Sequence, residues 1–388
     1  MKKRFMTLLM VSFTAVVTLS AAFDYRFDLL SFEPLHQEYT ADRDRAGLDF
    51  QWLWVDDMPE GVWQNGLYYE FKPLGGGEGQ ATDGFDEAPW MAMIHLGETL
   101  GLARSTFTFD HWLSPVSFDF SFQGSMVLGM EGGMADMIGY DGVFFYGASA
   151  SIADRFSLRI GLHHYCTHYG DGTLKLLGLD RNGIPFDPTG DANSNFTIYK
   201  KYIRMEALAV GLSIIPYEGI RLYGEMNFVL PGLTHAFDTQ IFAPTWFDPE
   251  NNIHVQHKDD SYHAMIANFG IELSYPIFPK LGKTTLSYDC HAYEEGKIKY
   301  KYTEEEQAMY PDWDHDNYRA YYDRNAAWEF EHELVLSQEI NEMVSFEIGW
   351  HNGRFPLNSM YYQRCNYVYV GARINPDATV TVYDSAKR

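Results

Sequence analysis

Residues 117–128 read SFDFSFQGSMVL and alternate apolar and polar side chains with a period of two. Phe118, Phe120 and Phe122 share one face of such a segment, whereas Asp119 and Gln123 lie on the other. A period of two is that of a β-strand, whose successive side chains point to opposite faces. The stretch therefore predicts a strand that separates an apolar environment from a polar one.

The same alternation recurs along the chain. It returns at 219–230, 262–275, 328–336, 343–350 and, with Val368, Val370, Ala372 and Ile374, near the end. The connections alternate between short turns and long polar loops, as in membrane β-barrels. The short ones are 153–155, 215–219, 276–283 and 339–343, and the long ones are 170–194, 231–261, 294–325 and 352–364. We expect an all-β fold: an up-and-down antiparallel transmembrane β-barrel of about twelve strands, the first two within 86–110.

The N-terminus has the features of an export signal. Lys2, Lys3 and Arg4 precede an apolar stretch over 5–19, and residues 20–22 are small. We therefore expect residues 1–22 to be a cleaved signal peptide. Beyond it, no apolar run approaches the ~18 residues that a membrane helix needs, so a membrane location requires a closed barrel. The predicted domains are the signal peptide, a periplasmic extension or lumen plug over 23–85, the barrel over 86–374 and a periplasmic tail over 375–388.

Composition narrows the function. The net charge is −24, or −27 once the three basic residues of the signal are removed, which excludes a nucleic-acid partner. Aromatic residues make up 16% of the chain, a proportion that suits the aromatic girdles of a membrane barrel. Three cysteines in an exported chain leave at least one unpaired, so disulfides do not organise the fold.

A family resemblance rests on four stretches. They are GYDG (139–142), RFSLRIGLHHYCTHYGDG (155–172), YIRMEALAVGLS (202–213) and HNGRFPLNSMYYQRCNYVYVGARI (351–374). The second resembles the central motif, His-x-Ser-Ser-His-x-Gly-Asp-Glu, of a bacterial family known as a domain of unknown function, number twelve-zero-seven. The likeness covers most of 110–374 and implies an outer-membrane barrel without an established activity. Cys166 and Thr167 replace the serines and Gly172 the glutamate; the matching residues are His164, His168, Gly170 and Asp171.

His164 and Cys166 form the first candidate site. Strand parity places them, with Leu158 and Ile160, on the lipid-facing side. A histidine and a cysteine two residues apart on one face can touch, as a base and a nucleophile must. Outer-membrane phospholipase barrels carry a His-x-Ser pair on the lipid-facing wall, and the spacing is the same here. The alternative is interfacial, because such side chains also suit the headgroup level. No third residue that orients the histidine can be assigned from the sequence.

Two further sets of residues are expected inside the barrel. His163, His291 and His351 form a candidate divalent-metal site, although the sequence favours scattered lumenal histidines that are hydrogen-bonded to their neighbours. Opposed charges predict either a pore lining or a self-neutralised plug. The positive row is Arg159, Arg204 and Arg221, and the negative row is Glu329, Glu331, Glu333 and Glu347.

These observations predict a structural or solute-passage barrel of the bacterial outer membrane. The expected partners are outer-membrane lipids, with small charged solutes or divalent cations as further candidates, and no cofactor is indicated. Two alternatives stay open. One is a membrane-embedded lipid-ester hydrolase that uses the His-x-Cys pair, and the other is a secreted, soluble β-rich binding protein.

Overall fold

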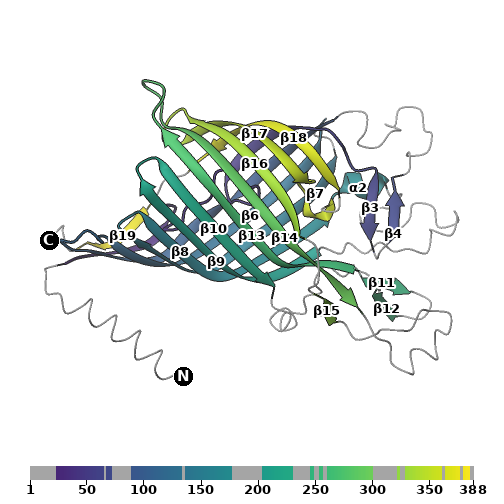
Figure 1. Ribbon diagram of the computed structural model, residues 1–388, viewed down its shortest axis with the longest axis horizontal. Helices are drawn as coiled ribbons and strands as arrows, with labels where there is room; N and C mark the ends of the chain where they lie inside the picture. Colours follow the sequence, from purple (N-terminus) through teal and green to yellow (C-terminus); the bar gives the residue numbers. More distant parts are fainter. Residues whose placement is uncertain are drawn as a thin grey trace.

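Long antiparallel strands dominate the computed structural model of the protein (Figure 1). It describes residues 23–64, 67–71, 89–132, 136–176, 203–229, 245–248, 253–256, 260–299, 321–323, 328–360, 363–375 and 379–384. The expected signal peptide lies outside these residues. The wall is built from β2 (Leu48–Val55), β5 (Trp90–Thr108), β6 (Val116–Glu131), β7 (Met137–Ile152), β8 (Phe156–Tyr169), β9 (Ile203–Tyr217), β10 (Ile220–Val229), β13 (Asp260–Tyr275), β14 (Thr284–Lys299), β16 (Trp328–Glu339), β17 (Val344–Arg354) and β18 (Arg364–Ile374).

Shorter elements lie beside this wall. They are β1 (Asp24–Ser31), β3 (Gly61–Gln64), β4 (Leu67–Glu70), β11 (Thr245–Asp248), β12 (Ile253–Gln256), β15 (Tyr321–Asp323), β19 (Thr379–Asp384), the helix α2 (Asp171–Leu176) and the 3-10 turn η3 (Asn358–Met360). Within the described residues, no helix is long and apolar enough to cross a membrane.

The sheet closes on itself. Each wall strand pairs antiparallel with its neighbours, and β5 pairs with β2 on one side and with β6 on the other. Among the described residues this makes a closed barrel of twelve strands, as the sequence predicted.

The side-chain alternation explains why the barrel is polar inside and apolar outside. On β6, Ser117, Asp119 and Gln123 are buried in the interior, whereas Phe118 and Phe120 are exposed on the outer surface. The other wall strands repeat this pattern, with exposed Leu, Ile, Phe and Trp facing outward. An outer surface of this kind is stable only against lipid. The protein is therefore an integral barrel of a bacterial outer membrane.

The two ends of the barrel differ. Short turns join β7 to β8, β9 to β10, β13 to β14 and β16 to β17, and β19 lies at this end. Gly219, in the turn after β9, has φ +77°, and a Cβ there would stand 2.5 Å from the carbonyl oxygen of Ser274. The opposite end carries β3, β4, β11 and β12 (Figure 1). By the general pattern of such barrels, the short turns are periplasmic and the long connections external.

The structure corrects the predicted start of the barrel. Strand β2 belongs to the wall, although it lies in 23–85, which we expected to form an extension or plug. Residues 90–108 form the single strand β5 rather than two strands. Strand β1 pairs with the periplasmic half of β5, β2 pairs with its external half, and β19, from the expected tail, pairs with β1. The alternation missed β2 because Leu53 and Val55 make its inner face apolar over the second half of the strand, where Trp52 and Trp54 make the outer face apolar as well.

Between β1 and β2 the chain leaves the wall and runs through the interior. We call residues 32–47 the internal segment. Its side chains Tyr39, Ala41 and Arg45 are buried, and Tyr39 stacks on Tyr223 of β10 with ring centroids 3.8 Å apart. The interior of the barrel is therefore filled both by side chains of the wall and by the internal segment, which contains no strand.

An apolar cluster closes the external side of this interior. Phe355, Leu357 and Met360, from the connection between β17 and β18, are fully buried. They pack in one cluster with Val127 and Leu53 from the wall. The external part of the interior thus contains a packed apolar cluster, and the middle is polar.

Candidate functional site

Strand β8 carries the candidate nucleophile pair on its outer face. Leu158 and Ile160 are exposed toward lipid, and strand parity continues through His164, Cys166 and His168, which are partly exposed. All three lie in the external half of the strand, next to the connection that leads into α2. The apolar part of the face anchors β8 in lipid, and its polar part lies toward the outer surface of the membrane.

Glu206 supplies the partner that the sequence analysis could not assign. Strand β9 pairs with β8 so that Glu206 stands directly opposite His164. Its Oε1 atom lies 2.7 Å from Nδ1 of His164, and the residue is only 5% exposed. A carboxylate at Nδ1 fixes the ring orientation and leaves Nε2 as the nitrogen that can exchange a proton with a nucleophile.

Cys166 completes the group. Its thiol is within hydrogen-bonding reach of the imidazoles of His164 and His168. Gly142 lies opposite on β7 and leaves room for the sulfur, because a Cβ at Gly142 would stand 2.7 Å from Sγ. The ring of Tyr140 stacks on His168 with centroids 4.4 Å apart. We call His164, Cys166 and Glu206 the outer-wall triad, because they are a candidate base, a candidate nucleophile and a carboxylate that can orient the base.

The second half of the family motif shapes the chain after β8. Thr167 points to the interior and is buried. Gly170 allows a close approach to β7, because a Cβ there would stand 2.0 Å from the carbonyl oxygen of Met137. Asp171 opens helix α2, whose Thr173 donates a hydrogen bond to the carbonyl oxygen of Ile138 at 2.7 Å. These positions build the end of the strand and touch none of the triad side chains in the described contacts.

The positive row meets the internal segment. Arg159 pairs with Glu225 on the wall and lies 3.8 Å from Glu38 of the internal segment. Arg221 pairs with Glu272 at 3.2 Å and donates hydrogen bonds to two main-chain oxygens of the internal segment. Both arginines are buried, so they bind the internal segment rather than water in an open channel.

The negative row is matched in the same way. Arg43 of the internal segment lies 3.5 Å from Glu331, and Arg45 forms a buried ion pair with Glu347. Glu329, nearer the external end, pairs with two arginines of the wall. Glu38 of the internal segment therefore lies near Arg159 of the positive row. Arg43 and Arg45 of the segment lie near glutamates of the negative row. In the described part of the chain, two residues of each row therefore contact this segment: Arg159 and Arg221 on one side, Glu331 and Glu347 on the other.

Arg204 was expected in the positive row, and the register places it elsewhere. It pairs with Cys166. Because paired residues of a sheet occupy the same face, position 204 belongs to the outer face rather than to the lumenal row. Position 204 also has the same parity along β9 as Leu208, Val210 and Leu212, which face outward.

The three predicted histidines are all buried in the interior but have different partners. His163 contacts Asn227 through Nδ1 at 2.9 Å, and Nδ1 of His351 lies 3.2 Å from Glu333. His291 lies near the internal segment instead. No contact within the described part of the chain joins the three histidines, so they form no shared metal site there.

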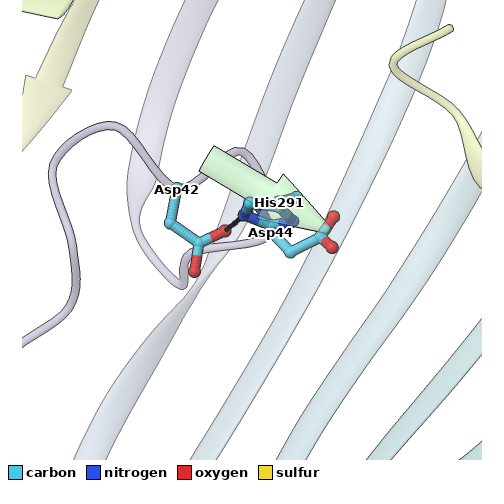
Figure 2. A group of neighbouring side chains, drawn as sticks. All are labelled: Asp42, Asp44 and His291. Carbon is cyan, nitrogen blue, oxygen red and sulfur yellow. Dashed lines mark hydrogen bonds and ion pairs between the residues drawn. The ribbon is translucent and has the colours of Figure 1, made fainter. Parts of the chain in front are cut away.

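His291 belongs to a different group, which Figure 2 shows. Asp42, Asp44 and His291 each direct one donor atom to a common region, with these atoms within 4.8 Å of one another. Burial raises the pKa of Asp44, and Arg43 offsets only part of this effect. Burial acts in the same direction on Asp42, but the hydrogen bond and charge of His291 outweigh it, so the pKa of Asp42 is lowered.

The sequence analysis did not identify two features of these candidate sites, Glu206 and the position of the internal segment. Glu206 had a recognisable signal, since it is a lone carboxylate at an outward position followed by Leu208, Val210 and Leu212 at the other outward positions. A charge on a lipid-facing position marks a site. The placing of the internal segment had no such signal. Its Asp-Arg-Asp-Arg run at 42–45 reads equally as a solvated loop.

Comparisons with known proteins show likeness in fold. No family model matches the chain, and no curated protein matches it. Among solved structures, the chain is similar to the NanC porin at 9% identity and a TM-score of 0.35, over 85% of this chain and 100% of that one. The Escherichia coli outer membrane phospholipase A gives 10% identity and a TM-score of 0.38, over 89% and 95%. A Pseudomonas aeruginosa FadL homologue gives 9% and 0.30, over 92% and 90%.

Proposed function

We propose that this outer-membrane barrel is a lipid-ester hydrolase that works from its outer wall. The observation that carries the proposal is the 2.7 Å contact between Glu206 and His164, beside the thiol of Cys166. All three groups lie on the outer face, in the external half of β8 and β9. Ester bonds of outer-leaflet lipids lie at the same boundary between acyl chains and headgroups.

The chemistry follows from the roles of the three groups. His164 takes the thiol proton as the sulfur of Cys166 attacks the ester carbonyl carbon. The proton then passes to the departing alcohol oxygen, the carbon–oxygen bond breaks, and a thioester remains on Cys166. Water, deprotonated by His164, attacks the thioester and releases a carboxylic acid and the thiol. Glu206 holds the imidazole and stabilises the imidazolium in both steps, and His168, the second imidazole beside Cys166, would donate to the developing oxyanion.

The filled interior favours the outer wall as the working surface. The ion-paired internal segment and the apolar external cluster occupy the described lumen. A lipid substrate needs no passage through the lumen, because it reaches the outer-wall triad by lateral diffusion in the membrane.

The test is fatty-acid release from phospholipid vesicles that contain the reconstituted protein. A background with Cys290→Ala and Cys365→Ala leaves Cys166 as the only cysteine and should keep the wild-type rate. Cys166→Ala should abolish release, and His164→Ala should reduce it by about 10² to 10⁴, the usual contribution of a general base. Cys166→Ser should retain measurable activity, because serine can be activated by the same base.

The same assay can contradict the proposal. Equal release by the single-cysteine protein and by its Cys166→Ala variant would assign any activity to a contaminant. No release from phosphatidylethanolamine, phosphatidylcholine or lipopolysaccharide vesicles would remove the hydrolase function altogether. Heat-dependent gel mobility checks in each case that the variant is a folded barrel.

Gated solute passage is the second candidate function, favoured by the charged rows of the interior. Only non-covalent contacts hold the internal segment between them. Passage then requires this segment to leave the lumen, which would expose Arg159 and Arg221 opposite Glu331 and Glu347.

A further inference from the structure

The group around His291 contains more negative charge than its neighbours neutralise. Asp42 and Asp44 come from the internal segment, and Asp289 lies on β14, two residues before His291. Oδ1 of Asp42 is 3.4 Å from Nε2 of His291, and Oδ1 of Asp289 is 3.0 Å from the same nitrogen. Arg43, 3.6 Å from Asp44, is shared with Glu331. Buried carboxylates in such excess require a proton or a cation.

Asp289 gives an independent indication of a ligand. The residue is fully buried, and its Oδ2 accepts a hydrogen bond from the hydroxyl of Tyr223 at 2.7 Å. Its Oδ1 accepts no hydrogen bond and points at Nε2 of His291. A buried carboxylate oxygen without a hydrogen bond is costly unless a positive charge lies next to it.

Three polar atoms lie close to Nε2 of His291. They are Nδ2 of Asn268 at 2.9 Å, Oδ1 of Asp289 at 3.0 Å and Oδ1 of Asp42 at 3.4 Å. An imidazole nitrogen and several carboxylate oxygens that converge in this way are the donor set of a metal ion.

We propose that a divalent transition-metal ion of the Zn²⁺ class binds in the lumen between Asp42 and Asp44 of the internal segment and His291 of β14. Asp289 serves either as a fourth ligand or as the carboxylate that supports His291. The ligands come from two parts of the chain that are distant in sequence. The ion therefore fastens the internal segment to the wall, and its binding free energy adds to the stability of the closed barrel.

The experiment uses full-length protein in detergent, stripped of metal with a chelator and titrated with Zn²⁺ against a chromogenic competitor. We expect one ion per chain. Asp44→Asn and His291→Gln should each weaken binding at least tenfold. His163→Gln is the matched control, because His163 is a buried lumenal histidine outside the group. It should bind as the wild type does.

A second readout separates the site from the folding of the variants. Zn²⁺ should raise the temperature at which the unboiled gel band disappears in the wild type and in His163→Gln, but not in Asp44→Asn. Asp44 belongs to the internal segment and not to the wall, so the variant keeps the barrel strands intact. Absence of Zn²⁺ binding by the wild type would overturn the proposal and favour a protonated His291 between the carboxylates. Equal affinity in all three variants would overturn it as well, because the ion would then bind elsewhere.

Discussion

At the residue scale, the most informative position is Glu206. A charged side chain on the lipid face costs up to about 2–4 kcal/mol at mid-membrane and about 1 kcal/mol or less near the interface. Glu206 lies in the external half of β9 and faces His164, which lowers this cost. The placement is what a functional carboxylate needs, and it gives a direct prediction for the neighbouring thiol.

We predict that Cys166 alkylates faster than an ordinary membrane-facing thiol because His164 can take its proton. In the single-cysteine protein, the rate with a small maleimide should fall at least tenfold in His164→Ala at neutral pH. Glu206→Gln should lower it less, since the imidazole remains but loses its orientation. Labelling followed by mass shift measures the rates. If the alkylation rate changes in neither variant, Cys166 is an unreactive thiol at the membrane interface and the prediction is wrong.

The His-x-Cys pair and its outward parity could be predicted from the sequence, because a two-residue period fixes which side chains share a face. Glu206 could not be paired with His164, because the register between β8 and β9 depends on a long connection that the sequence does not measure. The face of Arg204 could have been predicted correctly, because it has the same parity as Leu208, Val210 and Leu212 on β9.

At the element scale, ion pairs hold the internal segment inside the barrel. Arg45 is 2% exposed and pairs with Glu347 and, at 3.6 Å, with Asp49. Removing one partner of a buried ion pair leaves the other charge uncompensated and costs about 3–5 kcal/mol. Replacing both partners by apolar groups is often close to neutral.

We therefore predict that Arg45→Met lowers the free energy of unfolding by about 3–5 kcal/mol, measured in urea from lipid vesicles. The double variant Arg45→Met/Glu347→Leu should recover most of this loss. The control is Arg364→Met, which breaks a half-exposed pair with Glu329 and should cost about 1 kcal/mol or less. A small effect of Arg45→Met, equal to that of the control, would mean that the segment leaves the lumen readily.

The wall strands from β6 to β18 could largely be predicted, because each has one lipid face and one lumenal face. Strand β2 could not, because Phe50, Trp52 and Trp54 put aromatic residues outward while Leu53 and Val55 enter the apolar cluster, so both faces are apolar. The path of the internal segment depends on ion pairs between residues hundreds of positions apart, such as Arg45 and Glu347, and no local pattern encodes these.

At the scale of the whole molecule, the barrel has two surfaces that differ in chemistry, its interior and its outer wall. The described interior contains buried ion pairs, the acidic group around His291 and an apolar cap, and the proposed chemistry lies on the outer wall. A barrel of this design should not conduct ions while the internal segment is in place.

We predict silent bilayers for the wild type and stepwise conductance for a variant without the internal segment. Ser31 pairs with Gly101 and Leu48 with Leu96 on β5, so the ends of the segment are about 17 Å apart along the strand. A linker of about six Gly and Ser residues in place of 32–47 bridges that distance. Conductance by the wild type would contradict the closed interior and favour solute passage. A silent variant would mean that the apolar cap closes the lumen alone.

The measurement that tests the central claim most directly is the mass of the single-cysteine protein after reaction with short-chain phosphatidylcholine and an acid quench. The outer-wall triad predicts an acyl group on Cys166, held as a thioester, which hydroxylamine removes. The acyl form should accumulate further when hydrolysis of the thioester is slowed at low temperature, and it should be absent in Cys166→Ala and strongly reduced in His164→Ala. A protein that releases fatty acid without ever carrying an acyl group on Cys166, or that carries it equally in His164→Ala, would contradict the claim.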